Sequence, residues 1–361
     1  MRASRLERLI REFPQNGIKF MLEDPRNTRD MLALAEHEAV NWIDFSRARL
    51  VRTTFVARDF RHVEADVVLT APLHRLQGGQ RRLLWLYLLI EHQSQPDLLM
   101  PLRILDYVVQ IFKAQMRIWS RTHASFAGFR LQPVLPVVLY TGIQRWSSPG
   151  TLADLVEMAE RFRQFTPIFE PLFVNLPAMT PARLETAGGF FGRVLRLVQQ
   201  REAQPRAFQH LLEQVVASLE EMPPAERLRW LELLSYIHAL VYHERHGSEH
   251  ARLQETIQAS VQSELHQREV ATMGQTIAEK LKSEGRREGL KKGLKKGLEK
   301  GQRVEAVRVR RETLLRLLQK RYHDLPFAVA DAVGKTTDVK QLDTWLDRFA
   351  IAQSLTDIGI S

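Results

Sequence analysis

Two acidic residues at the ends of two apolar stretches could do chemistry together. Asp66 precedes the run Val-Val-Leu, and Glu91 follows the run Leu-Leu-Ile and is itself followed by His92 and Gln93. Two carboxylates held a few ångströms apart repel each other unless one is protonated or a cation lies between them. The pattern therefore predicts either a raised carboxyl pKa or a metal site.

The spacing of these acids predicts that a β-hairpin brings them together. Residues 65–73 and 83–93 are rich in Val, Leu, Trp and Tyr and are typical of strands. The paired glycines Gly78 and Gly79 between them supply the positive φ angles of a hairpin turn. A turn centred there places Asp66 opposite Glu91, with their Cβ atoms roughly 5 Å apart.

Alternation along a strand then decides which neighbours share the site. Gln93 points to the same face as Glu91, and His92 points to the opposite face. Such a site suits phosphodiester hydrolysis with Mg²⁺, which polarises the phosphate and lowers the pKa of a bound water. Asp66 and Glu91 are the expected ligands, with the main-chain carbonyl of His92 as a third.

The composition agrees with a hard cation. The chain contains no cysteine, which excludes disulfides, thiolate zinc sites and a cysteine nucleophile. A metal must therefore be held by oxygen or imidazole ligands, and Mg²⁺ is expected, with Mn²⁺ as a substitute.

Other interpretations of the same residues stay open. Asp66 and Glu91 could be salt-bridged strand ends, with three arginines as available partners: Arg52, Arg58 and Arg61. Three further acids could either complete the site or be surface charge: Glu36, Glu38 and Glu64. His92 is more often a packed strand residue than a ligand.

The elements around the hairpin predict an α/β fold. Helical patterns at 6–44 and 100–119 and strand patterns at 48–57, 134–140 and 171–176 imply a mixed sheet flanked by helices. In the helix at 100–119 the expected apolar side is Leu102, Leu105, Val108, Val109 and Phe112. Arg103 shares a face with Tyr107 and Gln110, and could contact DNA phosphate or form an ion pair with Asp97 or Asp106.

The C-terminal third is helical in pattern and strongly basic. Glycine recurs every four residues from Gly285 to Gly301, and residues 279–311 carry 13 Lys or Arg against 5 Glu, a net +8 of the formal +10. Four lysines of this stretch are candidates for binding the DNA backbone: Lys291, Lys292, Lys295 and Lys296. A solvated linker or a self-associating helix are the alternatives, and five glycines at about 1 kcal/mol each make an isolated helix doubtful.

These patterns predict three segments. Residues 1–245 form the catalytic α/β domain with a helical C-terminal part, 246–311 a helical, basic linker, and 312–361 a small all-helical domain. No apolar run is long enough for a bilayer or a signal peptide, so we expect a soluble, cytoplasmic protein without a membrane partner. The positive charge suits DNA as the partner.

The ordered motifs resemble one family. The segments Leu-Leu-Ile-Glu91-His-Gln93, Met100-Pro-Leu-Arg103 and Leu135-Pro-Val-Val-Leu-Tyr140 are similar to the recombination-promoting nuclease (Rpn) and YhgA-like transposase family, over about residues 15–180. That family is placed in the PD-(D/E)XK superfamily, in which Gln93 here takes the place of the usual lysine. The glycine repeat and the C-terminal segment also resemble its companions, the latter a small helical domain of unknown function.

The resemblance implies a restriction-endonuclease-like sheet and Mg²⁺-dependent DNA cleavage that promotes recombination. Asp66, Glu91 and Gln93 would be the catalytic residues, and Gln93 would orient the attacking water by hydrogen bonding, without a positive charge. Cutting both strands usually needs two active sites, so a homo-oligomer is expected. The alternative is a catalytically silent DNA-binding or assembly protein that keeps the nuclease fold.

Overall fold

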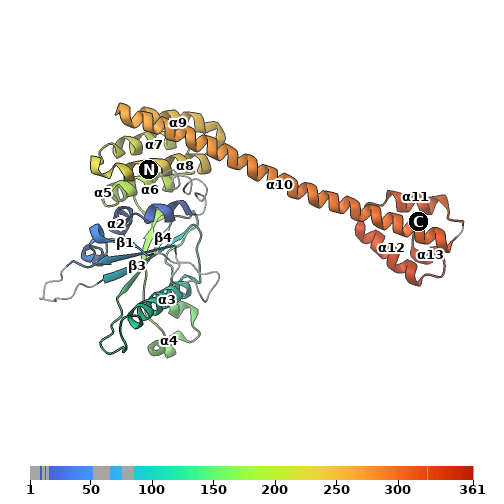
Figure 1. Cartoon of the computed structure of the whole chain (residues 1–361), viewed down its shortest axis with the longest axis horizontal. Coiled ribbons are helices and arrows are strands. Elements are labelled where there is room, and N and C mark those ends of the chain that lie inside the picture. The colour runs from blue at the N-terminus through green and yellow to red at the C-terminus, as the bar shows by residue number, and fades with distance from the viewer. Residues whose placement is uncertain are drawn as a thin grey trace. The chain divides into compact units, whose positions relative to one another are not determined.

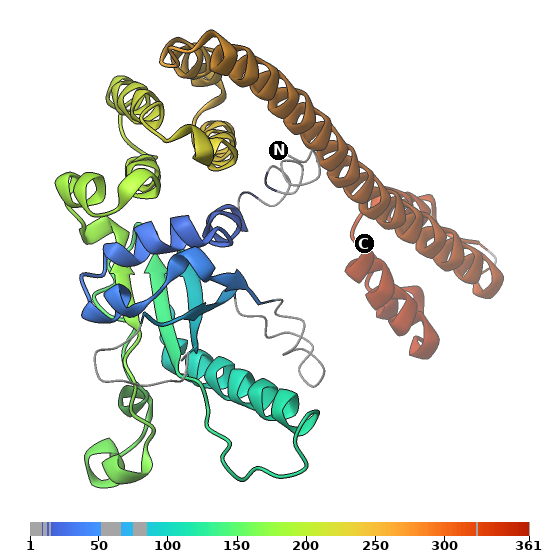
Figure 2. The ribbon, with the colours of Figure 1, turned by 60° about the vertical axis from the view of Figure 1, so that its left-hand side comes forward.

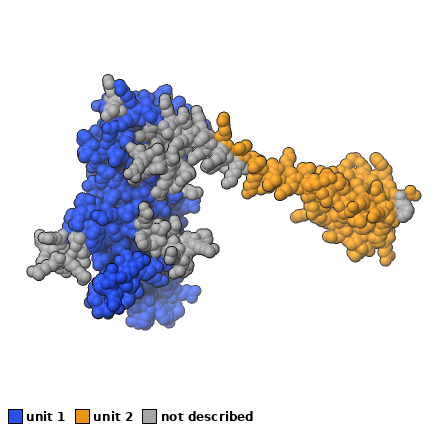
Figure 3. Space-filling view, in the orientation of Figure 1, with its two compact units in different colours: residues 1–279 blue, residues 280–361 orange. Residues whose placement is uncertain are grey.

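A computed structural model describes residues 9, 13, 16–51, 66–74, 85–322 and 324–360 of the chain. It divides into two compact units, Met1–Glu279 and Lys280–Ser361 (Figure 3). The first unit contains a five-stranded mixed sheet in the order β1-β2-β3-β4-β5. The strands are β1 (Arg49–Leu50), β2 (Val67–Pro72), β3 (Trp85–Gln93), β4 (Val134–Tyr140) and β5 (Leu172–Asn175).

The predicted hairpin register is confirmed. β2 and β3 are antiparallel and pair Val67 with Ile90, so the next position along places Asp66 opposite Glu91. β3 and β4 run parallel, as do β4 and β5, and this makes the sheet mixed as expected. The hairpin turn itself, most of the strand expected at 48–57, and Glu64 lie outside the described residues.

Helices cover both faces of the sheet. One face carries α3 (Met100–Ser120), and the other carries the helical residues 16–22 and α2 (Pro25–Ala33) (Figures 1 and 2). Beyond these N-terminal helices stack α5 (Pro181–Thr186), α6 (Gly189–Gln199), α7 (Pro205–Leu219), α8 (Arg227–Glu244) and α9 (His250–Ala259). The short α4 (Ala159–Phe162) lies between β4 and β5 in the chain. The predicted α/β class, with a helical region after the sheet, is therefore confirmed.

The buried side of α3 differs from the prediction. Met100, Ile104, Tyr107 and Ile111 are buried against Leu89 and the α3 side of the sheet. Two residues expected on the apolar side, Leu102 and Val109, are 51% and 37% exposed. The buried stripe follows the helical spacing of four, three and four residues from Met100, and the predicted stripe was out of phase with it.

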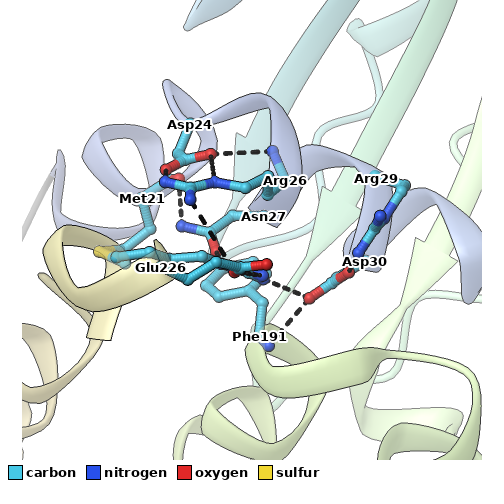
Figure 4. A network of polar contacts seen from close by, with 9 residues as sticks. Met21, Asp24, Arg26, Asn27, Arg29, Asp30, Phe191 and Glu226 are labelled. Atoms are coloured by element: carbon cyan, nitrogen blue, oxygen red, sulfur yellow. Dashed lines mark hydrogen bonds and ion pairs between the residues drawn. The ribbon is translucent and has the colours of Figure 1, made fainter. Parts of the chain in front are cut away.

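A buried ionic network joins the N-terminal helix to α8 (Figure 4). Arg229, which is 1% exposed, pairs with the Asp30 carboxylate, and its Nε donates to Asn27 Oδ1 at 2.8 Å. The Phe191 N–H also donates to Asp30 Oδ2, at 3.3 Å. The hydrogen bonds satisfy both charges in a water-excluded place, and they fix α2 against α6 and α8.

The long helix α10 (Glu264–Arg321) continues through all five repeated glycines, so this part of the predicted linker is helical as expected, despite the unfavourable helix propensity of glycine. Good helix formers surround each glycine, and propagation adds a hydrogen bond for each residue fixed. In the second unit, α10 is followed by α11 (Phe327–Lys335), α12 (Val339–Ile351) and α13 (Leu355–Ile358). Leu314, Leu318, Val333, Leu342 and Trp345 form a small core there. Among the described residues, no helix is long and apolar enough to cross a membrane.

Candidate active site

The two acids meet at one end of the β2–β3 pair, and each is held by the other strand's main chain. The Asp66 N–H donates to Glu91 Oε1 at 3.0 Å, and the His92 N–H donates to Asp66 Oδ2 at 2.8 Å. Both acids lie on the α3 face, since their neighbours Val68 and Leu89 pack against α3. The juxtaposition expected from the sequence is therefore present.

The two carboxylates have different surroundings. Glu91 is 1% exposed, and the Asp66 side chain is 25% exposed. Burial, together with the charge of Asp66, raises the pKa of Glu91 to about 8. The shift favours the protonated form of Glu91 while no cation is bound, and the hydrogen bonds from the Asp66 N–H and from Arg103 favour the charged form.

Arg103 approaches Glu91 from α3. Its Nη1 donates to Asp97 Oδ2 at 2.7 Å, and its Nη2 donates to Glu91 Oε2 at 3.2 Å and to Tyr107 Oη at 3.3 Å. Burial opposes its charge, but the hydrogen bonds to Tyr107 and Asp97 raise the Arg103 pKa. The ion pair with Asp97 that the sequence left open is formed, and the contact with Glu91 is additional.

The neighbours of Glu91 in β3 lie as alternation predicts. His92 points to the opposite face, where its Nε2 lies 2.8 Å from Thr141 Oγ1, and burial lowers its pKa to about 4. The Gln93 carbonyl accepts from the Thr141 N–H, on the β4 side. Successive carbonyls of a strand point in opposite directions, so the His92 carbonyl points toward β2 and Asp66, as does its N–H.

The close approach of two chain segments beside the site requires a glycine. A Cβ at Gly142 would lie 2.3 Å from the Ser94 carbonyl oxygen and 2.4 Å from Tyr140 Oη. Any side chain there would separate the end of β4 from the residues that follow Gln93. Gly142 therefore helps to set where β3 ends.

Two of the other acids considered from the sequence, Glu36 and Glu38, do not join the site. Glu36 is exposed and pairs with Arg183 at 3.3 Å, and Glu38 is exposed in a short 3-10 helix. Surface charge, the alternative for both, is what the structure shows. Within the described ranges no group of three His, Asp or Glu side chains could hold a metal.

One charged residue at this site was missed by the sequence reasoning. Lys19, in the helical residues 16–22, places its Nζ 3.7 Å from Asp66 Oδ1. A signal was available, because Lys19 interrupts an apolar run in which Ile18, Phe20 and Met21 are at most 5% exposed. Its contact with a residue 47 positions away could not be read from that run.

The candidate DNA-binding lysines lie in α10, away from the site in sequence. Lys295 and Lys296 are exposed, as are the repeat leucines Leu294 and Leu298 beside them. Lys291 and Lys292 belong to the same helix, and their side chains lie outside the described part of the structure. An exposed basic helix is what the prediction requires, and DNA binding by it stays a prediction.

Comparison with known proteins gives one match. The family model described as "Putative transposase, YhgA-like" matches residues 16–229. This range includes the whole sheet and the helices up to the start of α8, and it ends before α10 and the second unit. No curated protein and no solved structure matches the chain.

Proposed function

The chain belongs to the YhgA-like transposase family, and on that premise we propose that it is a Mg²⁺-dependent DNA endonuclease that hydrolyses phosphodiester bonds and promotes recombination. The observation that carries the proposal is the pair Asp66 and Glu91, held face to face by cross-strand hydrogen bonds. A fold-stabilising role alone would not require two like charges at one point, since their repulsion is unfavourable.

The donor set suits a hard divalent cation. Mg²⁺ in proteins is commonly held by one or two carboxylates and keeps several waters, and Mn²⁺ accepts the same oxygen ligands. Asp66, Glu91 and the His92 carbonyl would hold it. The pKa of about 8 at Glu91 supports this fit, because a nearby cation would relieve the burial and repulsion that keep this carboxyl protonated. When bound, the cation would polarise the phosphate and lower the pKa of a water.

The protein's own groups would position the reactants. Gln93 shares the face of Glu91 and would hold the attacking water by hydrogen bonding. Arg103 keeps Glu91 in place through its contacts with Glu91, Asp97 and Tyr107. A phosphate contact by Arg103 would require exchange of one of these partners, and it stays a prediction.

DNA is the expected substrate because of where the positive charge lies. The exposed lysines Lys295 and Lys296 belong to the stretch of net charge +8, which would bind the phosphate backbone without sequence preference. Lys291 and Lys292 would contribute in the same way. Cutting of both strands would need two copies of the site, so we propose that the active form is a homo-oligomer.

Cleavage of supercoiled plasmid by the full chain tests the proposal. We expect nicking or linearisation with Mg²⁺ or Mn²⁺, none with EDTA, and none in Asp66→Ala or Glu91→Ala. Equal background cutting in every lane would contradict it.

A catalytically silent DNA-binding or assembly protein is the second candidate. It is favoured by the ion pair of Arg103 with Glu91 Oε2, which occupies an oxygen that a metal would need. In that case plasmid would be bound but not cut, and Asp66→Ala would change neither property. Gel-shift and cleavage assays on the same samples separate the two functions.

A further inference from the structure

Lys19 is a charged residue within a run of buried apolar residues in the helical segment 16–22. Its neighbours Ile18, Phe20, Met21 and Leu22 are between 0% and 5% exposed, and the Lys19 side chain itself is 22% exposed. Placing a long, flexible, charged side chain there costs desolvation and conformational entropy. Its position is therefore informative about the site that it reaches.

Lys19 reaches Asp66 from the helical residues 16–22, on the face of the sheet opposite to α3. Its Nζ lies 3.7 Å from Asp66 Oδ1, and its charge opposes the rise in the Glu91 pKa. Arg103 acts on Glu91 from α3, its Nη2 lying 3.2 Å from Glu91 Oε2. The acids thus lie between two cations carried by different layers of the fold.

The contact with Asp66 leaves the ammonium group with donors to spare. The separation of 3.7 Å is that of an ion pair and is too long for a hydrogen bond. Asp66 Oδ2 already accepts from the His92 N–H at 2.8 Å. The three N–H donors of Lys19 are therefore not consumed by this carboxylate.

Arg103 is less able to serve a substrate. Its two terminal nitrogens donate to Asp97, Glu91 and Tyr107, which orient the guanidinium toward protein groups. Gln93 lies on the correct face but is neutral. Arg103 uses three of its five N–H donors in these contacts, whereas the contacts of Lys19 with the described residues leave all three of its donors for a substrate.

We propose that Lys19 is a catalytic residue that supplies the positive charge missing at Gln93, by donating from Nζ to a non-bridging oxygen of the scissile phosphate. The inference rests on the proposed nuclease function and deepens it. As the water oxygen bonds to phosphorus, the bond to the leaving sugar oxygen breaks, and negative charge grows on the non-bridging oxygens. The water loses a proton to solvent, the leaving oxygen gains one from solvent, and Lys19 stays protonated.

The variant Lys19→Met tests this, since it removes the charge and keeps an unbranched side chain. We expect plasmid nicking by the full chain to fall about 100-fold, the size of effect seen when one such donor is removed. Mn²⁺ binding, followed by calorimetry without DNA, should become about fivefold tighter, because a like charge next to the cation is removed. Lys113→Met, at an exposed position of α3, is the matched control and should change neither quantity.

A second variant restores the positive charge at position 93, in β3, and makes the test more specific. In the double variant Lys19→Met, Gln93→Lys we expect at least tenfold recovery of nicking over Lys19→Met alone. Recovery would show that the missing charge, and not altered packing at residue 19, caused the defect.

Each remaining outcome decides against the inference. Wild-type nicking by Lys19→Met, with Asp66→Ala inactive, would overturn the role of Lys19 and leave the nuclease intact. Loss of both nicking and Mn²⁺ binding in Lys19→Met would show a structural role. A wild-type protein that neither nicks DNA nor binds Mn²⁺ would overturn the proposed function and this inference with it.

Discussion

Two carboxylate clusters in the first unit differ in the charge of the group that lies opposite the carboxylate. In one, Asp30 faces Arg229, and each charge has hydrogen-bond partners (Figure 4). In the other, Asp66 faces a second carboxylate, Glu91, and Arg103 and Lys19 approach from outside the pair. The first cluster sets opposite charges directly against each other, and the second sets two carboxylates side by side, with a cation beside each of them.

The difference distinguishes an ion pair that stabilises helix packing from a carboxylate pair that could bind a metal. A matched buried pair makes removal of one partner costly, because the other charge is left alone. A like-charged pair has the opposite property, since removal of one member relieves repulsion. Stability and function should therefore respond in opposite directions at the two clusters.

The largest expected effect is on cleavage. Asp66→Ala and Glu91→Ala should each lower plasmid nicking by about 1,000-fold or more, because each removes a proposed metal ligand, and this corresponds to about 4 kcal/mol of barrier. Thermal unfolding should show no large loss of stability in either variant, since removal of one acid relieves repulsion. Glu38→Ala, at an exposed acid, is the control, and a loss of cleavage in it would weaken the assignment.

The next effect concerns the matched cluster. Asp30→Ala should destabilise the first unit by up to about 3–5 kcal/mol, because the 1% exposed Arg229 would lose its buried carboxylate partner and keep only the more exposed Glu226, at 2.9 Å. The double variant Asp30→Ala, Arg229→Met should recover part of that loss. Denaturant unfolding measures both free energies, and a double variant no more stable than Asp30→Ala would show that charge pairing is not the cause.

A smaller effect of opposite sign is expected at Glu91. Its folded pKa of about 8 lies above the unfolded value near 4.5, so the folded state binds more protons between these pH values, and stability falls as pH rises through this window. In metal-free buffer at pH 8, Glu91→Gln should therefore be at least about 1.4 kcal/mol more stable than the wild type, the equivalent of one pKa unit.

The measurement is chemical unfolding of both proteins at pH 5 and pH 8 with EDTA. The gain should shrink at pH 5, where Glu91 is protonated in the folded protein. A variant equally stable or less stable than the wild type at pH 8 would show that Glu91 is not under strain from burial and repulsion.

The smallest effect is expected for the basic residues of α10, where a change should affect DNA binding and not stability. Changing the four lysines Lys291, Lys292, Lys295 and Lys296 to Gln should leave stability unchanged. The slope of log DNA affinity against log salt concentration should become less steep by up to about 3.6. This is about 0.9 for each phosphate that the protein no longer neutralises. Fluorescence anisotropy over a salt series measures the slope, and an unchanged slope would place DNA binding elsewhere.

Local sequence patterns predicted one of the two clusters and not the other. The pairing of Asp66 with Glu91 could be predicted from the sequence pattern of paired glycines between two strands and from strand alternation, which act over a few residues. The pairing of Asp30 with Arg229 joins residues 199 positions apart and depends on how whole helices pack. No local pattern contains that information.

The same limit explains the remaining errors. The sequence identified α3 but mistook its buried side, because apolar residues occur around much of its circumference and the sheet selects among them. Lys19 was overlooked, since its contact with Asp66 forms only when the helical residues 16–22 lie against the end of β2. The family match at residues 16–229 confirms the resemblance read from motifs, and it leaves the C-terminal segment as a prediction.

The donors that hold the two acids in place belong to the backbone. The His92 N–H and the Asp66 N–H are present whatever side chains those positions carry, except proline. Position 92 can therefore drift in evolution without disturbing the orientation of Asp66. Relatives that diverged far enough to share little more than the two acids could still present them in the same arrangement.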